Sequence, residues 1–138
     1  MALLPRRGVL ALAAVIDVAL HAGGRPVSAK ALAGRHGLPP RHLEPVLQAL
    51  VHTGILRGIR GPRGGYELAR DEHLITADDI LRAAGSVEAE EDEGLGVTQS
   101  DLLTTIVLPA LAEAERSFST VLRGITIADL KSQAAGQA

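Results

Sequence analysis

The spacing of glycine is the feature that most limits the folds open to this chain. Gly23-Gly24, Gly37 and Gly54 each follow a segment in which apolar residues recur at helical spacing, so each segment can form only a short helix. The first predicted helix covers residues 9–22, and its apolar residues predict that it is mostly buried. The N-terminal part of the chain therefore predicts three short helices in succession.

The second and third predicted helices are separated by very few residues. The second begins after Ser28, whose hydroxyl can accept a hydrogen bond from an unpaired backbone N–H, and it ends at Gly37, which can adopt a left-handed conformation. The third opens with Pro39-Pro40 and runs to about Thr53. Pro45 has no backbone N–H, so we expect this helix to be irregular at its N-terminal end. The pair matches a helix-turn-helix, although an ordinary helical hairpin has the same features.

Two short predicted strands, residues 55–60 and 66–70, flank a turn that is rich in glycine and proline. A helix-turn-helix followed by such a β-hairpin is a winged helix, and here its tip carries arginine. Because glycine lets the backbone approach DNA closely, we expect Arg60 to enter the minor groove and Arg63, with Arg57, to contact phosphates. The alternatives are a solvated charged turn and a nucleotide-binding phosphate loop, and the second lacks the Gly-Lys-Ser/Thr ending of such loops.

The C-terminal half is predicted to contain a short helix, a linker, a long helix and a tail helix. Thr76 caps the short helix, residues 77–84, and Gly85 ends it. Residues 86–99 hold five acidic residues and two glycines without periodicity, which is typical of a mobile linker. The long helix spans about 24 residues from Ser100, with a kink or a restart at Pro109. The tail helix covers residues 126–134.

The long helix carries an apolar stripe that a domain of this size cannot easily enclose. Its members recur at intervals of three and four residues, and they are Leu103, Val107, Leu111, Ala114, Phe118 and Val121. Two copies related by a two-fold axis would bury the stripe and place two winged helices side by side, as a palindromic DNA site requires. The alternative is a helix that folds back over its own domain. We therefore divide the chain into a DNA-binding domain at 1–85, a linker at 86–99, and a dimerisation helix with its tail at 100–138.

The composition excludes several classes of protein. The 138 residues include no cysteine, one tyrosine and one phenylalanine, which removes thiolate metal sites, disulfides and base-stacking platforms. The five histidines lack metal-ligand spacing and no catalytic motif is visible, so we expect no metal, no cofactor and no enzyme activity. The formal net charge is −2, but residues 1–70 carry +7 and the remainder −9. This split predicts a basic face for a polyanion.

The Arg6-Arg7 pair and the apolar run after it resemble a secretory signal. Asp17 interrupts the run, no clear cleavage site follows His21, and a membrane span needs about 20 apolar residues. We therefore expect a cytoplasmic protein that does not enter a membrane.

Several of these segments together resemble a known family. They are Leu38-Pro-Pro-Arg-His-Leu-Glu-Pro-Val-Leu-Gln-Ala-Leu, Gly54-Ile-Leu, and the hairpin sequence Arg60-Gly-Pro-Arg-Gly-Gly-Tyr66-Glu-Leu-Ala-Arg70. With them, roughly residues 3–123 of the chain resemble the Rrf2 family of bacterial winged-helix transcription regulators. The resemblance implies a mainly α fold with a small β-hairpin, a dimer that pairs through the long helix, and sequence-specific binding to double-stranded DNA.

The resemblance also implies the residues that contact DNA. The third helix would enter the major groove, with Arg41, Gln48 and Glu44 as candidates for contacts to guanine, adenine and cytosine. The full set of expected contacts is Ser28, Lys30, Pro40, Arg41, His42, Glu44, Gln48, Arg57, Arg60, Arg63 and Tyr66.

One departure from the family concerns its metal cluster. Members that carry an iron–sulfur cluster place three cysteines before the long helix, where this chain has acids and glycines, so it looks like a cluster-free member. We expect a homodimeric repressor. The alternatives are a regulator that responds to an unidentified small-molecule effector and a protein-interaction module that uses the winged-helix scaffold without a specific DNA site.

Overall fold

The first three helices form as their end signals predict. The computed structural model describes residues 5–21, 23–92 and 101–136, with the backbone alone at 86–92. In it α1 (Arg6–His21), α2 (Ala29–His36) and α3 (Pro40–His52) follow one another. The Ser28 hydroxyl accepts a hydrogen bond from the Ala31 N–H at 3.0 Å, and Gly37 has a φ of +63°. Both ends of α2 are therefore set by local chemistry.

Helix α3 is continuous, so the predicted irregularity near Pro45 is wrong. Pro45 lies inside a helix that runs without a break from Pro40. A proline at this position removes a single hydrogen bond, to the carbonyl of Arg41 in the first turn. Arg41 and Pro45 are both exposed, so water can satisfy that carbonyl.

The hairpin consists of β1 (Leu56–Ile59) and β2 (Gly65–Leu68), which pair antiparallel with Leu56 opposite Leu68. Val27, just before α2, bridges to Tyr66 through two backbone hydrogen bonds of 2.8 Å. Gly65 lies at this crossing with a φ of +153°, and a Cβ there would collide with the carbonyl of Val27. The hairpin is thus joined directly to the helix-turn-helix.

Helix α4 (Ala77–Asp92) is longer than predicted. It follows a short 3-10 turn, η1 (Glu72–Leu74), and continues through Gly85, where the sequence predicted an end. A glycine inside a helix costs only about 1 kcal/mol relative to alanine, and the alanine and glutamate residues after it are good helix formers. Residues 86–92 of the predicted linker are therefore helical, and the remainder of that linker lies outside the described residues.

The C-terminal part consists of η3 (Leu103–Val107), a π-helical stretch, then α5 (Leu108–Arg123) and α6 (Ile127–Ala135). Pro109 occupies the first turn of α5, and the backbone stays helical at Val107 and Leu108, so the predicted restart of the helix at this proline is not what the structure has. Thr126 caps α6 in a reciprocal arrangement with Asp129, and Thr76 caps α4 in the same way with Asp79. The two caps form an antiparallel bridge, so α4 and α6 begin side by side.

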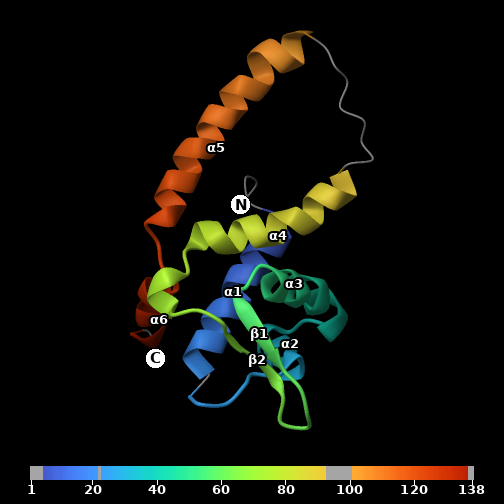
Figure 1. Cartoon of the computed structure of the whole chain (residues 1–138), viewed down its shortest axis with the longest axis vertical. Coiled ribbons are helices and arrows are strands. Elements are labelled where there is room, and N and C mark those ends of the chain that lie inside the picture. Colours follow the sequence, from blue (N-terminus) through green and yellow to red (C-terminus); the bar gives the residue numbers. More distant parts are fainter. Residues whose placement is uncertain (1–4, 22, 93–100, 137–138) are drawn as a thin grey trace.

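The core is aliphatic and lies among α1, α3, α4 and the hairpin. Its largest fully buried side chains are Leu32, Leu43, Leu47, Leu50, Ile55, Leu56, Ile75, Ile80, Ile127, Val15, Val18 and Val46. In Figure 1, α5 extends away from this core, whereas α6 returns to it beside α1. A mainly helical architecture with one β-hairpin is thus confirmed.

Candidate nucleic-acid interface

Helix α3 divides its residues between the core and the solvent. Leu43, Leu47 and Leu50 are buried, and the side chains that the sequence assigned to DNA contact lie on the exposed part of the helix. These exposed residues are Pro40, Arg41, His42, Glu44 and Gln48. The helix can therefore enter a groove without disturbing the core.

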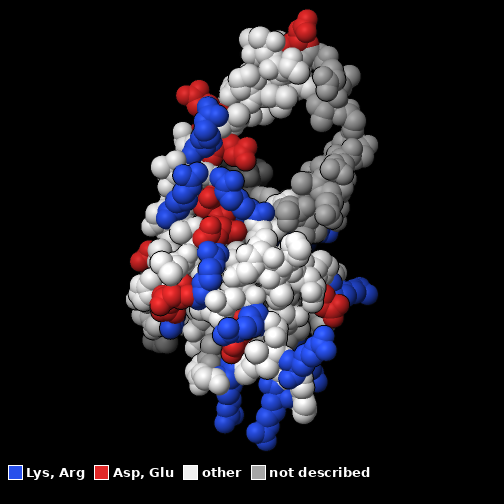
Figure 2. Space-filling view, viewed as in Figure 1, with Lys and Arg blue, Asp and Glu red and all other residues white. Residues whose placement is uncertain are grey.

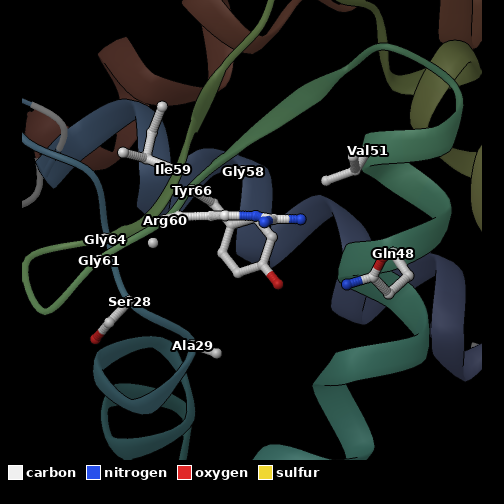
Figure 3. Close-up of a pocket in the computed structure, with 11 residues that line it drawn as sticks. Ser28, Ala29, Gln48, Val51, Gly58, Ile59, Arg60, Gly61, Gly64 and Tyr66 are labelled. Atoms are coloured by element: carbon white, nitrogen blue, oxygen red, sulfur yellow. The ribbon is translucent and has the colours of Figure 1, made fainter.

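A hollow of about 510 Å³ separates α3 from the hairpin, and we call it the wing hollow. Figure 3 shows Arg60 and Tyr66 extending from the hairpin toward α3, with Gln48 facing them from the helix. Ser28, at the start of α2, lines the same hollow. The structure thus brings together four of the predicted contact residues from three separate elements. No acidic side chain of the described ranges lines the hollow, so it suits a negatively charged ligand.

The tip of the hairpin depends on glycine and presents arginine. A Cβ at Gly64 would collide with the backbone carbonyl of Ile59, so this tight turn admits only glycine. Arg60 and Arg63 are exposed beside it. Arg57 differs from them, because its Nε donates a 2.8 Å hydrogen bond to Glu67 on the opposite strand.

The lysine and arginine side chains differ in whether they form an ion pair within the protein. Arg35, Arg57, Arg70, Arg82, Arg123 and Lys131 are paired with carboxylates. Arg7 has an interaction within the protein. Within the described part of the chain, the cations without a recorded ion pair are Arg6, Arg25, Lys30, Arg41, Arg60, Arg63 and Arg116.

Six of these seven unpaired cations belong to α1, the α1–α2 loop, α2, α3 and the hairpin. The exception, Arg116, lies on α5. Figure 2 shows blue side chains gathered at the lower end of the molecule, where Figure 1 places the hairpin tip, and mixed charges along α5. The winged-helix part therefore carries the charge that is free to meet a polyanion.

A buried carboxylate behind this surface escaped the sequence analysis. Asp17 on α1 is only 6% exposed and accepts three hydrogen bonds from Arg35, at 2.6 Å from Nη2 and at 2.9 and 3.2 Å from Nε. His36 Nε2 lies 3.0 Å from the second carboxylate oxygen, and His21 Nδ1 lies 3.2 Å from the first. Burial alone would raise the pKa of Asp17, but the hydrogen bonds and charges of these partners lower it below its usual value. The cluster fastens α1 to α2.

A second buried carboxylate fastens α4 to α5. Ser119, the buried residue of α5, donates a 2.7 Å hydrogen bond to Asp78, and Arg82 donates one of 2.8 Å. Arg123 lies 3.5 Å from the same carboxylate. Burial would raise the pKa of Asp78, but these hydrogen bonds and charges lower it. Ser119 and Arg123 of α5 thus face α4.

The predicted apolar stripe of α5 lies largely in solvent. Leu111 is 60% exposed, Phe118 40% and Val121 65%, and Val107 and Ala114 are also exposed. Leu103 is half-buried. Leu102, Ile106 and Leu108 add further exposed apolar surface. The alternative in which the stripe folds back over its own domain is not what the structure has.

The chain is similar to known transcriptional regulators in sequence and in fold. The Rrf2 family, described as "Iron-dependent Transcriptional regulator", matches residues 4–133. The HTH-type transcriptional regulator IscR of Vibrio campbellii is 35% identical over 97 residues, which are 70% of this chain and 58% of that relative. Among solved structures, IscR of T. potens has a TM-score of 0.73 at 30% identity and is matched over 95% of this chain and 87% of its own. CymR of B. subtilis, a global cysteine regulator, has a TM-score of 0.69 at 27% identity, with 94% and 96% covered.

These similarities confirm the winged-helix fold, and the relatives are named as transcriptional regulators. The chain spans less than two thirds of the length of the Vibrio relative. None of the helices in the described ranges is long and apolar enough to cross a membrane.

The iron in the family description does not fit the residues of this chain. The sequence contains no cysteine, so a cluster held by thiolates has no ligands. Among the described residues, no group of three or more His, Asp or Glu side chains is placed to hold a metal ion.

Proposed function

Because the chain belongs to the Rrf2 family of transcriptional regulators, we propose that it binds double-stranded DNA as a homodimer and represses transcription from a palindromic site. The observation that carries this proposal is the distribution of unpaired cations, six of which lie on the winged-helix part of the chain. A DNA duplex is a dense polyanion, and cations that are free of protein partners can neutralise its phosphates.

The α3 helix and the hairpin divide the work of recognition. Helix α3 enters the major groove and offers Pro40, Arg41, His42, Glu44 and Gln48. Arg60 reaches into the neighbouring minor groove from the hairpin tip, and Arg63 contacts the backbone. The DNA strand between the two grooves crosses the wing hollow, where Ser28 and Tyr66 lie close to its phosphates. Lys30, which is exposed on α2 outside the hollow, also contacts the backbone. Arg57 contributes to the backbone contacts only if DNA displaces Glu67.

Dimerisation uses the apolar stripe of α5. Two protomers that pair through Leu103, Val107, Leu111, Ala114, Phe118 and Val121 remove this surface from water. The polar contacts of Asp78 hold α5 in a defined position on its own protomer, which supports a defined spacing between two DNA-binding domains. A dimer bound across a promoter excludes polymerase, so repression is the expected outcome. A small-molecule effector stays a prediction, and a thermal-shift screen of metabolites tests it.

The proposal is tested by selection of bound sequences from random duplex DNA with the purified full chain. We expect a palindromic motif whose half-sites are about 10 base pairs apart or a multiple of that spacing. Sedimentation of the same sample should give a dimer. Weak binding that is indifferent to sequence at physiological salt would refute the proposal and favour the protein-interaction alternative.

A further inference from the structure

A second hollow lies beside α3, and the function just proposed assigns no ligand to it. It lies between the first turns of α1 and α3 and measures about 350 Å³, and we call it the α1 hollow. Its lining residues are Arg6, Arg7, Leu10, Arg41, His42 and Pro45. Among the residues that the structure describes, three guanidinium groups and an imidazole line this small space, and no carboxylate does.

Two of the three arginines of the α1 hollow, Arg6 and Arg41, are available to a ligand. Arg6 and Arg41 are exposed and have no recorded ion pair among the described residues, whereas Arg7 already has an interaction within the protein. The like charges of Arg6 and Arg41 repel each other across the hollow, and a bound anion relieves that repulsion. Arginine also presents a planar set of donors that matches the oxygens of a phosphate. The chemistry of the hollow therefore points to a phosphate.

The position of the hollow indicates where this phosphate comes from. Gln48 and Val51 of α3 line the wing hollow, whereas Arg41, His42 and Pro45 line the α1 hollow, and no residue lines both. At 100° per residue, Gln48 and Val51 lie on one side of the exposed face of α3, and Pro45 and His42 lie on the other. The two hollows therefore lie on opposite flanks of this face. The major groove is about 12 Å wide and is bordered by a phosphate strand on each side, so a helix in the groove has one strand along each flank.

We propose that Arg6 and Arg41 bind a backbone phosphate of the DNA strand that borders the major groove on the side away from the wing. The inference rests on the proposed function. It adds a contact from Arg6 at the start of α1, which is outside the set of DNA contacts expected from the sequence. It also changes the expected role of Arg41 from reading guanine to holding the backbone. His42 lies in the same hollow and can donate to the same phosphate.

The first test measures the salt dependence of binding of the full chain to a random-sequence duplex. The slope of log binding constant against log salt should fall by about 1 per protomer in Arg6→Gln and in Arg41→Gln. Arg6→Lys should keep most of the slope, because it keeps the charge. Arg116→Gln is the matched control, since it removes an exposed, unpaired arginine of α5, and it should leave the slope unchanged.

The second test locates the phosphate. On the operator recovered by selection, single phosphates are replaced by neutral methylphosphonates, and binding of wild type and variants is compared. We expect one phosphate whose replacement weakens DNA binding by wild type but not by Arg6→Gln. A second phosphate, on the other strand, should weaken binding by wild type but not by Arg63→Gln when it is replaced. A different result would overturn the inference and assign the hollow to a free anion. In that result inorganic phosphate stabilises wild type but not Arg6→Gln, and the two proteins have the same salt slope in DNA binding.

The two levels of proposal fail in different ways. If wild type binds neither random nor selected duplexes, the proposed function itself fails. If wild type binds DNA but Arg6→Gln and Arg41→Gln have the same salt slope as Arg116→Gln, only the phosphate contact in the α1 hollow is refuted.

Discussion

The Asp17 cluster makes a sharp prediction about stability, because one buried carboxylate holds three partners from two helices. Replacing it by asparagine keeps the shape and one acceptor oxygen, but places an NH₂ donor against the donors of Arg35 or His36. Removing one member of a buried ion pair costs about 3–5 kcal/mol. The Arg35 side chain is 38% exposed, so water recovers part of this loss. We expect Asp17→Asn to lower the free energy of unfolding by about 2–3 kcal/mol.

The assay is urea unfolding at a fixed protein concentration, because the stability of a dimer depends on concentration. At about pH 7 the midpoint of unfolding should fall, and the melting temperature should drop by roughly 6–12 °C. Glu113→Gln is the control, since it removes an exposed carboxylate of α5 for which no partner is recorded in the described residues. An Asp17→Asn protein that unfolds at the same urea concentration as Glu113→Gln would refute the reasoning.

The same variant has a defined dependence on pH. The partners of Asp17 hold its pKa below the usual value in the folded state, so the carboxylate stabilises the fold above the unfolded pKa of about 3.9. This contribution is lost as the pH falls through the lowered pKa of the folded state. The difference in unfolding free energy between wild type and Asp17→Asn should therefore be full near neutral pH and shrink in acid. A difference that stays constant down to about pH 3 would contradict the pairing with Arg35.

Three further predictions concern the interface, the dimer and the wing. Arg60→Ala should weaken binding to the selected operator by about 1–3 kcal/mol at fixed salt, and unchanged affinity in that titration would reject its role in the minor groove. Leu111→Asp combined with Val121→Asp should place charges on the exposed stripe and shift sedimentation toward the monomer, whereas an unchanged dimer would place the interface elsewhere. Gly65→Ala should lower the free energy of unfolding by more than about 1 kcal/mol, because the new Cβ meets the carbonyl of Val27. A melting curve identical to that of wild type would show that the hairpin shifts freely to admit the Cβ.

The features that local chemistry determines could be predicted from the sequence. Ser28 and Gly37 bound α2 as expected, because a cap and a left-handed glycine act within a few residues of the chain. The exposure of Leu111 and Val121 also follows from the spacing of the stripe. The same local reasoning failed at Gly85, where one weak helix breaker stands between good helix formers and does not end α4.

The contacts that depend on how helices cross could not be predicted from the sequence. Asp17 meets Arg35 and His36 only because α1 and α2 pack at one particular angle, and nothing in the spacing of these residues indicates it. Ser119 reaches Asp78 for the same reason, across two helices that are far apart in sequence. Arg57 and Glu67 were within reach of sequence reasoning, since they lie opposite each other once the register of the hairpin is known. The assignments to individual DNA contacts stay predictions.

The bridge between Thr76 and Thr126 gives the long helix a mechanical role. Helix α4, which packs against α1 and α3, and helix α6, which packs against α1, both begin at this bridge. Because α5 runs toward α6 and is also joined to α4 by the hydrogen bond from Ser119 to Asp78, a displacement of α5 by a neighbouring protomer acts on both helices together. Ile80 of α4 and Ile127 of α6 are both buried in the aliphatic core beside α1, so a displacement of these helices also displaces core side chains. A displacement of α5 is thereby transmitted to the part of the molecule that carries α3 and the hairpin.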